Sequence, residues 1–115
     1  MPLVRVQLSV AIDDQARASM MAELSRAVAQ ALGKPESYVM VVLEPQRSML
    51  MGASDDPAAL VEVRSVGTIS PGQATELSGA LSAVITKAGV DTRRIYSNFT
   101  GVPGAMWGMG GSTFS

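Results

Sequence analysis

Hydrophobic and polar residues alternate along the first ten residues of the chain, MPLVRVQLSV. Val4, Val6 and Leu8 are apolar, and a polar residue stands between each pair of them. A period of two places alternate side chains on opposite faces of an extended strand. The pattern therefore predicts a half-buried strand over residues 2–10.

A helical spacing of three and four residues replaces this alternation after Asp13. Either Asp13 or Asp14 offers the side-chain oxygen that an N-cap requires. Gly33 suits the position after a helix, where φ is usually positive, and Pro35 cannot continue the helix. We therefore expect a helix that ends at Gly33, with its buried face formed by Ala16, Met20, Leu24, Ala27, Val28 and Ala31.

The segment YVMVVLE at residues 38–44 is almost entirely apolar and rich in β-branched residues. Strands that are covered on both faces have this composition. The segment therefore predicts a central strand of the sheet.

The second half of the chain repeats the same plan. Residues 60–69 alternate as a strand, and Ser70, Pro71 and Gln73 then provide a hydroxyl N-cap, a proline at the first helical position and a capping box. Gly89 ends the predicted helix, and residues 95–100 read as a further strand.

The order strand, helix, strand, given twice, predicts a single α+β domain over residues 1–115. Two right-handed βαβ units would form one four-stranded sheet with both helices on one face. No further helix is available for the other face, and the mean hydropathy of +0.24 is high for a soluble monomer. We therefore expect another copy of the chain to cover that face, and we expect the Gly-rich residues after Thr100 to form an arm or a pocket rim.

Composition narrows the possible chemistry. Nine Lys and Arg against ten Asp and Glu give a net charge of -1, which argues against a nucleic-acid partner. The chain has no Cys and no His, so it lacks the commonest metal ligands and the commonest general base, and we expect neither a metal nor a cofactor. Without a basic, apolar leader or a long apolar stretch, the sequence predicts a soluble cytoplasmic protein without a membrane segment.

Pro2 is the unusual candidate for a base. Removal of Met1, which small second residues permit, would leave a secondary amine at the start of a buried strand. Apolar neighbours disfavour the charged form of an amine and lower its pKa, so this amine could act as a general base near neutral pH. The alternative is structural, because proline is ordinary at the first residue of a strand.

Three further features of the sequence each allow two readings. Lys34 can complement the negative end of a helix dipole, or it can bind a substrate carboxylate from a short turn. Tyr96 and Asn98 lie two residues apart and so point to one face of their strand, where they can bond across strands or bind a substrate oxygen. The Met49, Leu50 and Met51 run is typical of core packing or of a soft subunit interface.

Several short motifs together resemble one known family. They are Met1 and Pro2 at a strand start, GKP at 33–35, MLMG at 49–52, VG at 66–67, YSN at 96–98 and STF at 112–114. In this order they resemble the macrophage migration inhibitory factor family of the tautomerase superfamily, and the chain is similar to a microbial member. The resemblance implies a homotrimer with an active site at each subunit interface, and cofactor-independent keto-enol tautomerisation of α-keto acids such as phenylpyruvate.

The resemblance also assigns roles to residues. Pro2 would be the general base, Lys34 would hold the substrate carboxylate or carbonyl oxygen, and Val66 would line the pocket. Tyr96 and Asn98 would come from the neighbouring subunit. The pocket wall would be formed by Met106, Trp107 and Phe114.

The chain also departs from the family pattern. Residues 57–61 read PAALV where many members carry a CxxC motif, so the thiol oxidoreductase activity of such members is excluded. Two alternative functions stay open: a cytokine-like receptor-binding protein, released by a non-conventional route, and a relative with another natural substrate and weak tautomerase activity.

Overall fold

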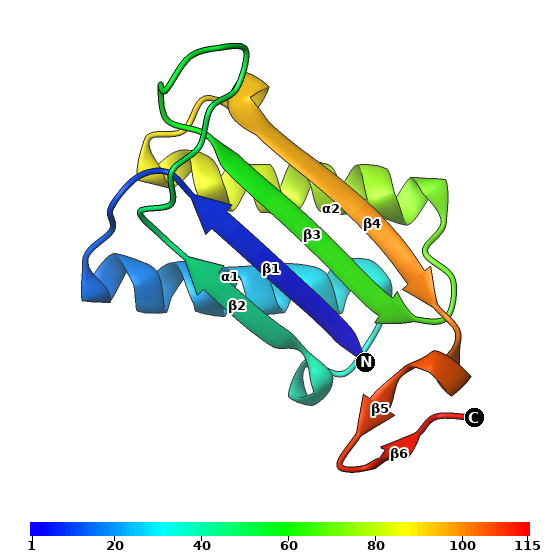
Figure 1. Ribbon diagram of the computed structural model, residues 1–115. Helices are drawn as coiled ribbons and strands as arrows, with labels where there is room; N and C mark the ends of the chain where they lie inside the picture. The colour runs from blue at the N-terminus through cyan, green and yellow to red at the C-terminus, as the bar shows by residue number, and fades with distance from the viewer.

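A computed structural model describes residues 1–115 as a four-stranded mixed sheet with two helices on one face (Figure 1). The main elements are β1 (Pro2–Leu8), α1 (Asp14–Leu32), β2 (Met40–Glu44), β3 (Ala59–Val66), α2 (Pro71–Ile85) and β4 (Ile95–Val102). The strand order is β2-β1-β3-β4, with β1 parallel to β2, antiparallel to β3, and β3 parallel to β4. The two predicted βαβ units and their shared helical face are confirmed.

The ends of α1 follow from its sequence. Asp13 is the N-cap, and its carboxylate accepts a hydrogen bond of 2.7 Å from the backbone N–H of Ala16. Gly33 adopts φ of 62°, in the left-handed region that a glycine enters without steric cost. Lys34 follows directly, and its backbone N–H donates to the Ala29 carbonyl at 3.0 Å, so the turn that stops the helix also fixes the backbone of the lysine.

The start of α2 is the predicted capping box. The Ser70 hydroxyl accepts from the Gln73 N–H at 3.1 Å, and the Gln73 side chain accepts from the Ser70 N–H at 3.0 Å. Pro71 occupies the first turn, where its missing N–H is not needed. The helix closes with a short 3-10 turn and with Gly89, which has φ of 89°.

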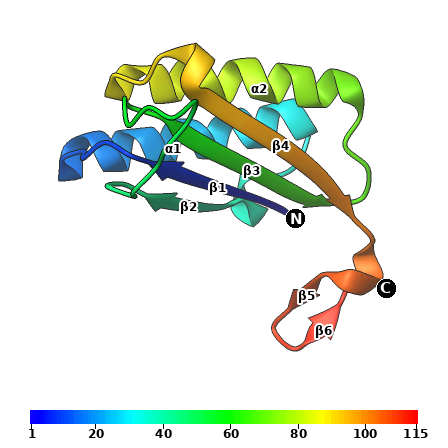
Figure 2. The ribbon, with the colours of Figure 1, turned by 45° about the horizontal axis from the view of Figure 1, so that its top comes forward.

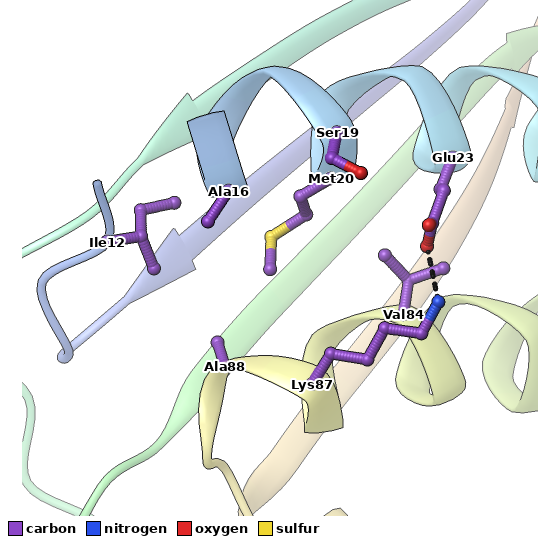
Figure 3. Close-up of a pocket in the computed structure, with 8 residues that line it drawn as sticks. All are labelled: Ile12, Ala16, Ser19, Met20, Glu23, Val84, Lys87 and Ala88. Atoms are coloured by element: carbon purple, nitrogen blue, oxygen red, sulfur yellow. Dashed lines mark hydrogen bonds and ion pairs between the residues drawn. The ribbon is translucent and has the colours of Figure 1, made fainter. Parts of the chain in front are cut away.

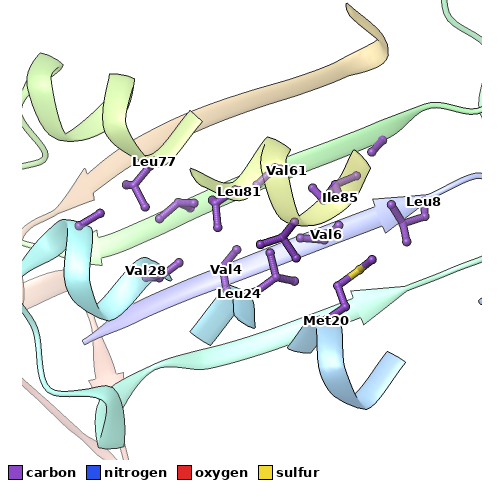
Figure 4. Close-up of a cluster of buried hydrophobic side chains, with 14 of the residues drawn as sticks. Val4, Val6, Leu8, Met20, Leu24, Val28, Val61, Leu77, Leu81 and Ile85 are labelled. Carbon is purple, nitrogen blue, oxygen red and sulfur yellow. The ribbon is translucent and has the colours of Figure 1, made fainter. Parts of the chain in front are cut away.

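The core lies between the helices and the inward face of the sheet (Figure 4). Alternate residues of β1 and β3 are buried, as the period of two predicts. The most deeply buried side chains include Val4, Val6, Leu8, Leu24, Val61, Val63, Leu77, Leu81 and Ile85. Pro2 belongs to the same inward row of β1 and is also buried, so the amino end of the chain is anchored by core packing.

The prediction that residues 38–44 form a central strand covered on both faces is wrong. β2 begins at Met40 and lies at an edge of the sheet, beside β1 only. Val41 and Leu43 pack against the core, whereas Met40 is 62% exposed. The second pairing edge of β1 is taken by β3, so β2 keeps one free edge. An apolar run identifies a strand, but it does not determine the place of that strand in the sheet.

The outer face of the sheet carries both charged and apolar side chains. Arg5 on β1 donates to Glu44 on β2 at 2.6 Å, and Arg47 donates to the same carboxylate at 2.8 Å. Glu62 and Arg64 from β3 lie on this face beside Arg5. The helices leave this face open, as Figure 1 shows.

Residues 103–115 leave the sheet at the end of β4 and form an arm (Figure 2). The arm contains a 3-10 turn, η4 (Gly104–Met106), and a hairpin of β5 (Gly108–Met109) and β6 (Ser112–Thr113). The backbone N–H of Phe114 donates to the carbonyls of Gly104 and Trp107 at 3.0 and 3.2 Å, which closes the arm on itself. This arm confirms the predicted role of the Gly-rich tail.

Arg94 holds the long connection between β2 and β3. Its guanidinium donates four hydrogen bonds of 3.0 to 3.2 Å to the backbone carbonyls of Met51, Ser54, Asp56 and Pro57. Leu50 in this connection is 73% exposed, so the Met-rich run is not core. Its alternative reading, a soft subunit interface, stays a prediction.

Gly101 and Gly79 give a matched test of how closely the backbone is packed at these two positions. A Cβ at Gly101 on β4 would overlap the backbone carbonyl of Gly67, so Gly101→Ala should destabilise the fold by about 1 to 3 kcal/mol. Gly79, inside α2, has open space around its Cα, and Gly79→Ala should stabilise the fold by about 1 kcal/mol. Urea unfolding measures both free energies, and a Gly101→Ala variant as stable as the parent would contradict the contact.

Candidate active site

An open cavity of about 270 Å³ lies at the amino end of β1. Three segments far apart in sequence line it: the chain start, the beginning of β2 with the turn before it, and the arm. The lining residues are Met1, Pro2, Ser37, Tyr38, Val39, Met40, Trp107, Gly108 and Met109. Pro2, the candidate base, therefore faces a hollow with a largely apolar wall.

Strand register explains why these segments meet. β1 and β2 are parallel, with Leu3 paired to Met40, so both strands begin at the same edge of the sheet. The 3-10 turn η1 (Glu36–Tyr38) leads into β2 and so lies beside Pro2. β4 ends near the same edge, and the arm that follows it lies on the side of the chain start in Figures 1 and 2. Trp107, Gly108 and Met109 of the arm line the same cavity as Pro2.

The electrostatics of this edge favour a neutral amine. The α-amino group at Met1 has a pKa lowered from its ordinary value of 8.0, first because burial disfavours its charged form and second because of the positive charge of Lys34. Lys34 lies at the end of α1, next to the turn that leads to Tyr38. The positive charge of Lys34 thus acts on the amine, although Lys34 itself does not line the cavity.

The other predicted site residues of the same chain lie at different distances from this cavity. Trp107 is part of its wall. The backbone N–H of Val66 donates to the Met1 carbonyl at 3.4 Å, so Val66 adjoins the chain start without lining the cavity. Met106 and Phe114 belong to the arm, 76% and 37% exposed, and neither lines the cavity.

Tyr96 and Asn98 lie away from the cavity of their own chain. Tyr96 on β4 pairs with Leu60, which pairs with Gln7, five residues along β1 from Pro2. At about 3.3 Å per residue this is roughly 17 Å along the strand, with β3 in between. Tyr96 is 67% exposed on the open sheet face, and no side-chain hydrogen bond of the chain involves Tyr96 or Asn98. One chain alone does not bring them to Pro2.

Sequence reasoning missed most of the residues that line the cavity, among them Tyr38, Met40 and Met109. Tyr38 and Met40 could have been found from the topology, because parallel strands joined by one helix begin at the same edge of a sheet. Met109 carried no such signal, because its position depends on how the arm folds back. Its side chain is 57% exposed beside Trp107 in the same wall.

A second hollow, of about 150 Å³, lies between α1 and α2 on the other side of the molecule (Figure 3). Ile12, Met20 and Val84 line it, and the Lys87 ammonium donates to the Glu23 carboxylate across its mouth at 2.9 Å. Its polar pair is already satisfied, and it holds none of the predicted site residues. The cavity at Pro2 is therefore the better candidate for an active site.

No cluster of three or more acidic side chains is placed to hold a metal ion. None of the helices is both long and apolar enough to span a bilayer.

Two βαβ units with one helical face and an amino-terminal proline in a pocket define a tautomerase-like domain. The family model described as macrophage migration inhibitory factor (MIF) matches residues 1–115. The chain is 33% identical to the macrophage migration inhibitory factor of Xenopus tropicalis, over 84% of this chain and 85% of that protein. It therefore belongs to the macrophage migration inhibitory factor family, within the tautomerase superfamily.

Solved structures agree with this assignment. The macrophage migration inhibitory factor of Toxoplasma gondii superposes with a TM-score of 0.93 at 37% identity, over 97% of this chain and 99% of that one. A homologue from Prochlorococcus marinus gives 0.91 at 37% identity, over 98% and 99%. The fold assignment thus extends over almost the whole length of both chains.

The charge of Lys34 can be tested directly. In protein that retains Met1, Lys34→Gln should raise the pKa of the α-amino group toward 8.0, because the neighbouring positive charge is lost. The rise is partial, since burial is the larger cause and is unchanged. The rate of amine acylation against pH, followed by mass spectrometry, measures this pKa. Lys34→Arg should leave the pKa low, and an unchanged pKa in Lys34→Gln would remove Lys34 from the site.

Proposed function

We propose that this protein is a cofactor-independent tautomerase that interconverts the keto and enol forms of α-keto acids such as phenylpyruvate. The observation that carries the proposal is the position of Pro2: a buried residue at the chain start that faces an apolar cavity beside a lysine. Membership of the tautomerase superfamily supports a reaction of this class.

Pro2 is the general base in this proposal. Once Met1 is removed, the Pro2 nitrogen becomes a secondary amine in an environment that already lowers the pKa of the amino group one residue earlier. A neutral amine can take the acidic proton from the carbon beside the substrate carbonyl. The electron pair left by that proton moves onto the carbonyl oxygen and gives an enolate. The protonated amine then returns the proton to the oxygen, which completes the enol and regenerates the base.

Lys34 supplies positive charge in this mechanism. An ammonium near the cavity can hold the substrate carboxylate or stabilise the negative charge that develops on the carbonyl oxygen. The aromatic group of a substrate such as phenylpyruvate would lie against Trp107 and the apolar residues of the wall. The charge and the apolar wall together favour an α-keto acid with an aromatic or apolar side chain.

The proposed active site is shared between copies of the chain in a homotrimer. Tyr96 and Asn98 project from the open sheet face and are remote from Pro2 in their own chain. A neighbouring copy could bring them to the cavity, where they would donate hydrogen bonds to substrate oxygens. The same assembly would cover the sheet face that the helices leave open. Val66, Met106 and Phe114 would then complete the rim of the site.

A cytokine-like binding role is the second candidate. It is favoured by the name of the curated relatives, macrophage migration inhibitory factor, which the Xenopus tropicalis protein carries. Such a role needs the surface of the protein and not the Pro2 amine. A receptor-binding assay in which a tautomerase-inactive variant binds as well as the parent would support it.

The role of Pro2 is tested without changing its side chain. In protein that keeps Met1, the Pro2 nitrogen is part of a peptide bond and cannot act as a base. We expect phenylpyruvate tautomerisation to fall about 10²- to 10⁴-fold relative to protein without Met1, the range for loss of a general base. Intact mass identifies the two forms. For the active form, kcat/KM should rise with pH through the lowered pKa of the amine.

Pro2→Gly provides a second comparison, because it keeps an amine but loses the ring that fixes its position. Its activity should fall at a temperature where its unfolding curve still shows a folded protein, although loss of the buried ring lowers its stability, and its mass in solution should stay that of the parent. Equal activity in the Met1-bearing form, in Pro2→Gly and in the parent would overturn the role of Pro2.

The shared site predicts complementation between inactive variants. Pro2→Gly and a Tyr96→Ala, Asn98→Ala double variant should each be nearly inactive alone. Refolded together in equal amounts, they should recover activity at about one quarter of the sites, because a neighbouring pair can combine an intact Pro2 with an intact Tyr96. Sedimentation of the mixture should give a trimer. Recovery of no activity from mixed trimers would show that each site is built from one chain.

A further inference from the structure

The thioether sulfurs are the atoms of this chain most open to two-electron oxidation. The sequence has eight methionines and no cysteine. Without thiols, a peroxide that reaches the protein reacts chiefly with methionine. Exposure then decides which methionines react, because a buried sulfur is shielded from the oxidant.

The most exposed methionines are not spread evenly over the molecule. Met40, Met106 and Met109 are 62%, 76% and 57% exposed, whereas Met20 in the core is 5% exposed. Met40 and Met109 both line the cavity at Pro2, although one comes from β2 and the other from the arm. Two of these three exposed methionine residues therefore form part of a single wall.

We propose that Met40 and Met109 are a paired modification site, whose oxidation to methionine sulfoxide by hydrogen peroxide changes the polarity of the active-site wall. In each reaction the sulfur gains one oxygen and is oxidised by two electrons, while the peroxide O–O bond breaks and the peroxide is reduced to water. The product side chain is polar and chiral, and a sulfoxide reductase can return it to the thioether.

The chemistry of the wall explains the expected effect. The thioethers of Met40 and Met109 adapt to an apolar ligand and make favourable contacts with aromatic rings. A sulfoxide oxygen in the same place needs a hydrogen-bond donor, and a bound aromatic ring would deprive it of water. Oxidation should therefore weaken binding of apolar substrates and leave the amine and Lys34 unchanged. The effect on turnover rests on the proposed function, but the oxidation itself does not.

The first readout is independent of enzyme activity. The parent protein without Met1 is treated with hydrogen peroxide, and peptide mass mapping follows the gain of one oxygen at each methionine. Met106 gives the rate of a fully open thioether, and Met20 gives that of a buried one. We expect Met40 and Met109 to react much faster than Met20, because the cavity that they line must stay open to a substrate in the assembled protein. Rates as slow as that of Met20 would overturn the proposal, whatever the activity of the protein.

The second readout is Trp107, the only tryptophan of the chain, which lines the same cavity. Its fluorescence emission should shift to longer wavelength as the wall becomes polar, and peptide mapping verifies that Trp107 itself is unmodified. The KM for phenylpyruvate should rise several-fold to about a hundredfold, with kcat changed much less. If neither the emission nor the KM changes after Met40 and Met109 are fully oxidised, the wall does not respond and the proposal fails.

Matched variants separate this effect from general damage. In the Met40→Leu, Met109→Leu double variant, peroxide should change the emission and the KM much less than in the parent, because only Met106 can still be oxidised beside Trp107. Met21→Leu removes a thioether from α1, outside the cavity, and should stay as sensitive as the parent. A double variant that loses affinity on oxidation as strongly as the parent would assign the effect to another residue. Absence of tautomerase activity in the untreated parent would instead defeat the proposed function, and the emission would then test this inference alone.

Discussion

The position of β1 in the middle of the sheet is the constraint on which the rest of the structure depends. This strand begins at residue 2 and pairs with β2 on one side and β3 on the other, so its backbone is held along its whole length. Its inward side chains, from Pro2 to Leu8, are buried under the two helices. The first residues of a chain are usually mobile, because no preceding residue holds them in place. Here core packing and two ladders hold it, which makes the terminal amine a group of defined position.

An amine in a fixed position is a group that could act as an acid or a base in a chain of this composition. The chain has no histidine and no cysteine, and its carboxylates lie mainly on the outer surface or in ion pairs. Burial, and after it the charge of Lys34, lower the pKa of the amino group. The strand that organises the core thus also positions the candidate base. A substitution at Pro2 therefore affects both the site and the stability of the fold.

In the proposed active site a neighbouring copy of the chain completes the cavity, which connects the site to assembly. The cavity is lined by the starts of β1 and β2 and by the arm. Tyr96 and Asn98 lie on the open sheet face, far along the strands from Pro2. The arm is held by its own hydrogen bonds around Gly104 and Phe114 and not by extensive packing on the sheet. Met40 and Met109 stand beside Trp107 in the cavity wall, and their flexible thioethers make this wall adaptable and also sensitive to oxidation.

The sequence by itself determined the elements and their ends. Alternation from Val4 to Leu8, the Asp13 cap, Gly33 and the Ser70 capping box all act through contacts within a few residues, so their outcomes can be read locally. Pro2 and Trp107 could also be selected as site residues, by chemistry and by resemblance.

Only the tertiary structure decided which segments meet. It placed β2 at an edge, gave Arg94 its four carbonyl partners, brought Tyr38, Met40 and Met109 to Pro2, and left Met106 outside the cavity. These outcomes depend on strand order and on the path of the arm, which join residues tens of positions apart. Local periodicity records which face of a strand or helix is buried, but it carries no information about which distant segment will lie against that face.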